Sequence, residues 1–233
     1  MTHQSYWENK NVLITGGTSG LGRALTMQIN ELGSNVGMIA RTKEKISEIE
    51  MMHPNVIGIQ GDVSKKQKIY PLAGEVHSRL GDIDILFNVA SYLGDTPLRN
   101  LIDTDCEDLE KVLQTNVLGP FRLSKAILPA MLLRKKGLIV NISSDAAISV
   151  YPTWGSYSIS KASIDHMSKI FDIELKAQGV RFLSIDPGDM NTPMHFAAIP
   201  DANPAELRDP NDSAAKIIEL IVSEDRSEVR RSV

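Results

Sequence analysis

Short apolar runs rich in Val and Ile alternate along this chain with longer amphipathic stretches. The near-continuous apolarity of the runs is typical of parallel strands that are covered on both faces. The runs predict strands at Asn11–Thr15, Ser34–Ala40, Val56–Gln60, Ile83–Asn88, Leu138–Ser143 and Val180–Ile185. Helical patterns lie at Gly20–Leu32, Lys43–Met51, Lys65–Leu80, Cys106–Arg134, Tyr157–Gln178 and Asp212–Ser223. This strand-then-helix order predicts an α/β fold, a Rossmann-like doubly wound parallel sheet with helices on both faces.

The chain of 233 residues has no linker rich in Pro, Gly or Ser, which predicts one domain over residues 1–233. Residues 1–9 form a polar amino-terminal extension. Residues 186–210 contain five prolines and follow the sixth predicted strand. Because ligands bind beyond the carboxyl ends of such strands, we expect this segment to cover a substrate, with a plain surface loop as the alternative. The charged tail, residues 225–233, is either frayed or a short strand within Glu228–Val233.

The net charge of −4 gives the chain no general attraction for nucleic acid or anionic lipid. No apolar run approaches the roughly 20 residues of a membrane span, and the first residues have no apolar segment of the secretory kind. These features predict a cytoplasmic protein. Its single cysteine, Cys106, excludes an internal disulfide, and the five histidines share no ligand spacing, so we expect no metal.

A glycine-rich turn, TGGTSGLG at residues 15–22, follows the first predicted strand and opens the first long helix. Glycines let the backbone approach a pyrophosphate, and the helix amino end offers free N–H groups and a positive dipole. The sequence therefore predicts a dinucleotide site, with phosphate contacts from Gly16, Thr18, Ser19, Gly20, Leu21 and Gly22.

The end of the second predicted strand decides which dinucleotide is preferred. NAD sites place an acid there for the ribose hydroxyls, but this chain has Arg41, whose guanidinium suits a 2′-phosphate. NADP(H) is therefore predicted over NAD(H). After the third strand, Asp62 and Val63 are placed to contact the adenine, although Asp62 is equally well explained as a helix N-cap.

Tyr157 and Lys161 lie four residues apart, on one face of a predicted helix. The same spacing at Tyr6 and Lys10 shows that it is weak evidence alone. The difference is Ser144, which lies thirteen residues before Tyr157, just beyond the fifth predicted strand. No equivalent residue precedes Tyr6.

With these motifs in order, the chain resembles a short-chain dehydrogenase/reductase over about residues 9–224. The turn fits the family's T-G-x-x-x-G-x-G loop. Asn88 and Ala90 fit two positions of its N-N-A-G motif, in which Val89 and Ser91 replace an asparagine and a glycine. The family's catalytic set falls on Asn116, Ser144, Tyr157 and Lys161, and its nicotinamide segment on Pro187, Gly188 and Thr192.

The resemblance implies an NADP(H)-dependent oxidoreductase that acts on a small carbonyl or alcohol. We expect Tyr157 to exchange a proton with the substrate oxygen, its pKa lowered by Lys161 and by the oxidised nicotinamide, while Ser144 hydrogen-bonds the same oxygen. The resemblance gives Lys161 the nicotinamide ribose as a second partner and Asn116 a water of a proton relay. The alternatives are an epimerase or dehydratase on the same scaffold, and an NADP(H)-sensing regulatory protein without turnover.

Three further residues are candidates for the substrate pocket beside Ser144. Trp154, Met190 and Met194 would give it an adaptable apolar wall, with core packing as the alternative for each. The predicted helices Cys106–Arg134 and Tyr157–Gln178 resemble those of the family's dimer contact, so a homodimer or homotetramer is expected. The charged tail differs from the apolar end that many relatives use in tetramers.

Overall fold

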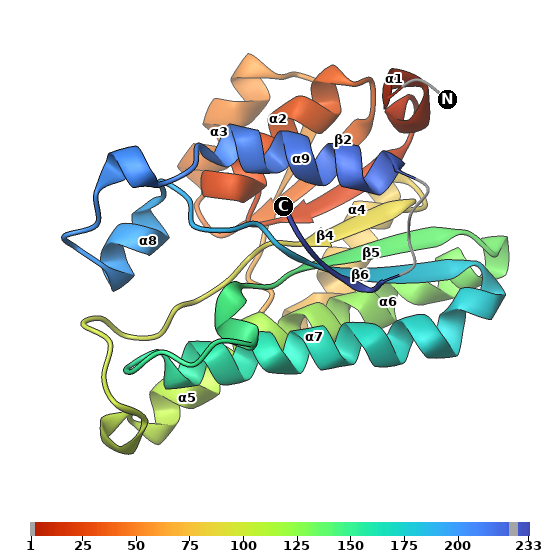
Figure 1. The fold of residues 1–233 in the computed structure, drawn as a ribbon. Helices are drawn as coiled ribbons and strands as arrows, with labels where there is room; N and C mark the ends of the chain where they lie inside the picture. Colours follow the sequence, from red (N-terminus) through yellow and green to blue (C-terminus); the bar gives the residue numbers. More distant parts are fainter. Residues whose placement is uncertain (1–2, 224–227) are drawn as a thin grey trace.

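The computed structural model describes residues 3–223 and 228–233, in which seven parallel strands form one sheet (Figure 1). The strands are β1 Asn11–Thr15, β2 Asn35–Ala40, β3 Val56–Gln60, β4 Ile85–Asn88, β5 Gly137–Ile142, β6 Val180–Asp186 and β7 Arg230–Ser232. Their order in the sheet is β3-β2-β1-β4-β5-β6-β7. The sheet thus grows outward from β1 in both directions, which confirms the predicted doubly wound fold.

Helices cover both faces of the sheet (Figure 1). One face carries α2 Gly20–Glu31, α3 Lys43–Met52 and α9 Pro210–Val222. The other carries α4 Ile69–Leu80, α6 Gly119–Arg134, which continues α5 Cys106–Leu113, and α7 Gly155–Leu175. No helix in the described part of the chain combines the length and apolar character needed to cross a membrane.

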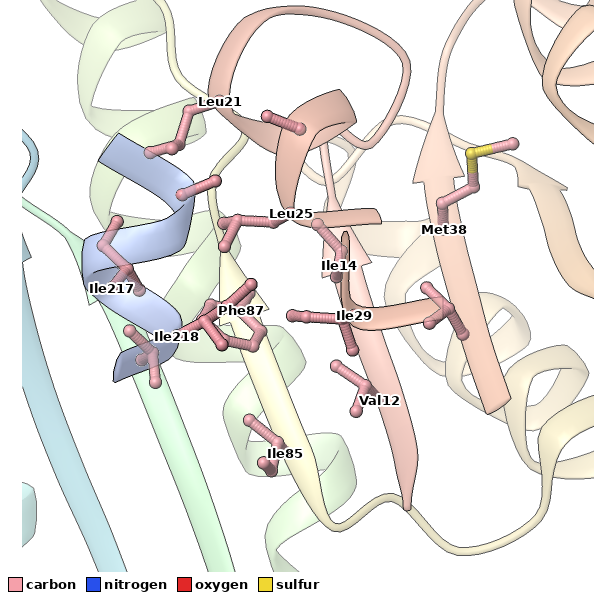
Figure 2. Close-up of a cluster of buried hydrophobic side chains, with 14 of the residues drawn as sticks. Val12, Ile14, Leu21, Leu25, Ile29, Met38, Ile85, Phe87, Ile217 and Ile218 are labelled. Carbon is pink, nitrogen blue, oxygen red and sulfur yellow. The ribbon is translucent and has the colours of Figure 1, made fainter. Parts of the chain in front are cut away.

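Two apolar clusters hold the layers together, one on each face of the sheet. Figure 2 shows the first cluster, in which Val12 and Phe87 of the sheet face Ile29 of α2 and Ile217 of α9. Leu13, the neighbour of Val12, belongs to the second cluster because side chains alternate along a strand. Both faces are covered, and so the strand sequences read as nearly unbroken apolar runs.

The helix predicted over Cys106–Arg134 is interrupted by a π-helical turn at Gln114–Leu118, where the Gly119 N–H donates to the Gln114 carbonyl. Pro120 explains the interruption, because it has no N–H for the Asn116 carbonyl four residues earlier. The wider turn carries Asn116, one of the predicted catalytic residues.

The amino-terminal end of the chain differs from expectation, and the carboxyl-terminal end adopts one of its two expected structures. Residues 3–7 of the supposed polar extension form helix α1, and Trp7 is fully buried against the first cluster. Lys10 lies 4.6 Å from the ring centroid of Tyr6, so this second Tyr–Lys pair packs on itself. The tail forms the strand β7, which was one of its two predicted structures. Residues 1–2 of the extension and 225–227 of the tail lie outside the described residues.

The predicted cover, residues 186–210, holds helix α8 Pro193–Ala198 and a short 3-10 turn at Pro204–Glu206. A bridge between Met190 and Arg208 joins its two arms. In Figure 1, α8 extends to the side of the molecule where the loops after the strands gather.

Candidate active site

A cavity of about 1060 Å³ opens at the carboxyl ends of the strands. It brings together most of the site residues that the sequence singles out. These are Gly16, Thr18, Ser19, Gly20, Leu21, Gly22, Arg41, Asp62, Val63, Ala90, Ser144, Trp154, Tyr157, Lys161, Pro187, Gly188, Met190, Thr192 and Met194. Asn88 and Asn116 are not among the described residues that line it.

The glycine-rich turn has the shape of a phosphate cradle. Gly16 has φ +72°, and a Cβ on Gly22 would lie 2.2 Å from the Gly16 carbonyl oxygen, so neither position accepts a larger residue without a shift. Helix α2 begins next to it, and within the described residues no side-chain hydrogen bond from its N-cap, Ser19, closes that end. The first N–H groups of α2 are therefore available to a phosphate, which fits a dinucleotide.

Arg41 lies at the opposite end of the predicted dinucleotide site, directly after β2. Its side chain is exposed, and its carbonyl accepts a hydrogen bond from the Gln60 amide nitrogen (3.0 Å). Asp62 accepts from the backbone N–H and the hydroxyl of Ser64 (2.9 and 2.7 Å). This carboxylate closes the turn after β3. The next 3-10 turn begins later, at Lys66, so Asp62 is not a helix N-cap.

Helix α7 carries Tyr157 and Lys161 on its buried face. The Lys161 ammonium donates to the Ile142 carbonyl at the end of β5 (2.8 Å), and its Nζ lies 5.2 Å from the centroid of the Tyr157 ring. The cation is therefore held against the tyrosine by the main chain of β5.

Burial dominates the titration of both groups. It lowers the pKa of Lys161 to about 8, although Asp165 and Asp186 oppose the shift. Burial also raises the pKa of Tyr157 well above its usual value, and a hydrogen bond with Ser91 opposes that shift. In the protein itself, burial therefore outweighs the effect expected of Lys161 on the pKa of the phenol, and the part expected of the oxidised nicotinamide stays a prediction. The phenol is held in its neutral, proton-donating form.

Ser144 lies just beyond β5, and its hydroxyl donates to the Asp145 carboxylate (2.9 Å). The same carboxylate accepts from the Tyr151 hydroxyl (2.7 Å) and from the Ala146 N–H (2.7 Å). Asp145 thus orients the serine from within the cavity. Sequence reasoning missed this residue, although its position next to Ser144 was the available signal.

Asn116 is buried beside the cavity, and both polar atoms of its side chain form hydrogen bonds. Its amide nitrogen donates to the Tyr92 carbonyl (2.8 Å) and the Ser160 hydroxyl (2.9 Å). Its amide oxygen accepts from the Tyr92 N–H (2.7 Å) and the Ser91 hydroxyl (3.2 Å). The side chain therefore holds the loop after β4 against α7, and a relay water would have to bind the Asn116 main chain.

Asn88 is buried within the fold rather than placed in the cavity. Its amide nitrogen donates to the Asn141 side chain (2.8 Å) and thereby links β4 to β5. The neighbouring Val89 and Ala90 N–H groups donate to the Thr15 hydroxyl (3.0 and 3.1 Å), which ties the glycine-rich turn to the end of β4. The Asn88 side chain thus holds β4 and β5 together and does not itself line the cavity.

The cover and the residue before α7 supply the remaining wall. Trp154, the N-cap of α7, packs edge-on against Tyr157, with ring centroids 5.8 Å apart, and lines the cavity. Met190 packs against the first apolar cluster, whereas Met194 is 37% exposed. Thr192 caps α8 by accepting from the His195 N–H (3.3 Å).

Known proteins are similar to this chain in sequence and in fold. The family model for short chain dehydrogenases matches residues 10–202. A short chain dehydrogenase of Pseudocercospora fijiensis is 33% identical over 81% of this chain, which spans 62% of that relative's length. A 3-oxoacyl-[acyl-carrier-protein] reductase of Staphylococcus epidermidis is 30% identical over 77% of this chain and 75% of its own. A short chain dehydrogenase of Escherichia coli, solved with NADPH, superposes with a TM-score of 0.89, at 25% identity and 98% coverage of both chains.

Proposed function

Because this chain is a member of the short-chain dehydrogenase family, we propose that it is an NADP(H)-dependent oxidoreductase that interconverts a small carbonyl compound and its alcohol. The observation that carries the proposal is a shared cavity. Ser144, Tyr157 and Lys161 line the same space as the glycine-rich turn and Arg41. A proton donor therefore lies in the cavity that fits a dinucleotide.

In the proposed mechanism, each residue has one task. When bound, the nicotinamide exchanges a hydride with the substrate carbon. Tyr157, kept neutral by burial, donates its hydroxyl proton to the carbonyl oxygen during reduction and takes it back from the alcohol in reverse. Ser144 hydrogen-bonds the same oxygen, in exchange for its contact with Asp145. Lys161 is charged below about pH 8 and stabilises the phenolate that remains.

Arg41 supports the preference for NADP(H). The guanidinium is exposed at the rim of the cavity, where it would pair with a 2′-phosphate. The E. coli relative was solved with NADPH, which agrees with this preference. In the Arg41→Asp variant, NADPH should bind about 10- to 100-fold more weakly, because a charge-assisted pair is lost. Affinity for NADH should change far less.

The Tyr157→Phe variant tests the proposed function. It keeps the ring that packs on Trp154 and removes only the proton donor. Oxidation of NADPH, followed at 340 nm across a panel of ketones and aldehydes, should fall by about 10²–10⁴-fold. NADPH binding, followed by its fluorescence, should be retained. Full reductase activity in this variant would contradict the mechanism, and a wild-type protein that binds NADPH but reduces no carbonyl would point to the sensing alternative.

A further inference from the structure

Arg230 belongs to the edge strand β7 and is not among the described residues that line the cavity, yet it contacts segments that carry the site residues. It pairs with Ser184 in the register between β7 and β6. Its side chain is 17% exposed and is directed toward the residues that surround Lys161 and Ser144. No pattern in the charged tail singles it out.

Arg230 reaches three segments at once. Its Nε donates to the Asp165 carboxylate on α7 (2.8 Å). Its Nη2 donates to the Ser144 carbonyl beyond β5 (3.1 Å) and lies 3.4 Å from the Asp186 carboxylate at the end of β6. These segments carry the Tyr–Lys pair, the serine, and the start of the Pro187-Gly188 turn.

The Ser144 contact fills a gap in the backbone ladder. The ladder between β5 and β6 ends with the Ser143 N–H, which donates to the Ile185 carbonyl (2.8 Å). Ser144 is the next residue, and its carbonyl accepts from the Arg230 guanidinium (3.1 Å) as well as from the Ala147 N–H (3.1 Å) and the Ser143 hydroxyl (3.4 Å). The planar, two-pronged arginine suits this task, because it binds a carbonyl and a carboxylate in fixed relative positions.

The two carboxylates need a cation. Asp165 lies one helical turn beyond Lys161, and the side chains of Asp165 and Asp186 are only 9% and 10% exposed. The charges of both acids act to raise the pKa of Lys161, and those of Asp186, Asp145 and Asp189 act to raise the pKa of Tyr157. Arg230 supplies a permanent positive charge beside these acids. His195 lies next to Asp189, with its Nδ1 3.7 Å from the carboxylate.

We propose that Arg230 is a positioning residue of the catalytic centre, which fixes the main chain of Ser144 and compensates the charges of Asp165 and Asp186 beside Lys161. The inference rests on the proposed roles of Ser144, Tyr157 and Lys161, and goes beyond them to a residue of the last strand. Without the guanidinium, two buried carboxylates would act on Lys161 uncompensated, and Ser144 would lose the contact that joins it to β7 and keep only its local hydrogen bonds.

Two variants separate the charge from the two-pronged geometry. Arg230→Met removes both, so kcat should fall by about 10- to 100-fold. The alkaline limb of its kcat profile should move to higher pH, because the uncompensated acids favour the charged form of Lys161. Arg230→Lys keeps the charge, so its pH profile should match the wild type while kcat stays about tenfold low. In both variants the Kd for NADPH, read by fluorescence, should remain within about threefold of the wild type.

Arg231→Met is the matched control, since its side chain points to the other face of the sheet. It should leave kcat and the pH profile unchanged.

If Arg230→Met does not fold, Arg230→Lys alone tests the inference. An unchanged kcat in either folded Arg230 variant, or an unshifted profile in Arg230→Met, overturns the inference. Tyr157→Phe is assayed beside them: an active Tyr157→Phe defeats the proposed function, whereas an inactive one beside active Arg230 variants defeats this inference alone.

Discussion

Ser91 is the residue at which this chain departs most informatively from its family. Relatives of this kind usually have a glycine there, and the serine adds a hydroxyl between Asn116 and Tyr157. A hydroxyl can accept from a neutral phenol and donate to a phenolate by a simple rotation. In the proposed mechanism, Ser91 would stabilise the charge that Tyr157 acquires when it gives up its proton.

Ser91→Ala should therefore lower kcat for carbonyl reduction by about tenfold, because a hydrogen bond to a charged group contributes about 1.5–3 kcal/mol. Ser91→Thr keeps the hydroxyl and is the matched control, with activity close to the wild type. Steady-state kinetics with NADPH in excess would measure both variants. Equal rates in the wild type and in Ser91→Ala would show that the hydroxyl has no catalytic role.

Lys161 carries a cost in stability that can be measured through pH. Its pKa is about 8 in the folded protein against 10.5 in the unfolded chain, so the unfolded chain binds more protons between these values. The contribution of Lys161 to stability is thus unfavourable below pH 8 and disappears as the pH rises to 10.5.

Between pH 7 and pH 10, the free energy of unfolding of the wild type should therefore rise by about 2–3 kcal/mol relative to Lys161→Met. Denaturant unfolding of the two proteins at both pH values measures the difference. At pH 7 the variant should be at least as stable as the wild type, and nearly inactive. A constant difference between the two proteins would place the pKa of Lys161 near its ordinary value.

At the scale of elements, helix α1 shows what periodicity misses. Its five residues are too few for an apolar repeat, yet Trp7 is fully buried, and the Trp7 carbonyl accepts from the Ser34 hydroxyl (2.6 Å). The Trp7 indole N–H is buried without a hydrogen-bond partner among the described residues. The ring therefore contributes through packing, while its polar edge acts against stability.

Trp7→Ala should lower the free energy of unfolding by about 3–5 kcal/mol, since it leaves a large cavity. Trp7→Phe keeps an aromatic ring and removes the unsatisfied N–H, so its loss should be much smaller. Chemical denaturation followed by circular dichroism measures both changes. Similar losses in the two variants would show that the indole edge, rather than the ring volume, anchors α1.

The elements that the sequence predicts well are those with a buried, repeated pattern. The six long strands and the helices between them were predicted close to their observed positions, because each buries a full apolar face. The exceptions have local causes that periodicity does not register. Pro120 turns one helix into two around a π turn, and β7 is a three-residue strand made of RRS. A strand so short and polar is specified by its partners, here Asp165 and Asp186.

At the scale of the whole molecule, the site residues fall into two groups. Gly16, Tyr157 and Lys161 were identified because their spacing is local. The contacts of Ser91 and of Arg230 were not predicted, since they appear only when distant segments meet, as in the contact between Ser144 and a residue 86 positions later. The cavity itself could be expected from the fold, because the strands of such a sheet end on one edge.

Assembly is the prediction that belongs to this scale. We propose that two copies pair through α6 and α7, where Leu133, Ile170 and Ile173 are 87%, 44% and 69% exposed. Such apolar side chains on long helices favour burial against a second copy. Ile173→Glu should lower the molar mass measured by light scattering, whereas Met51→Glu, on α3 at the far edge of the sheet, should leave it unchanged. A monomeric wild type would contradict the proposal.

The position of β7 has a consequence for the lifetime of the protein. Six strands and all buried members of both apolar clusters precede this last strand, and only Val233 beyond it packs against the first cluster, so its loss would remove little of the packing that keeps the chain folded. A protease that trims residues 228–233 would nevertheless take away the guanidinium that joins three segments of the site. We expect this trimming to abolish the proposed catalytic activity before it unfolds the core. A fusion tag that displaces β7 should have the same effect.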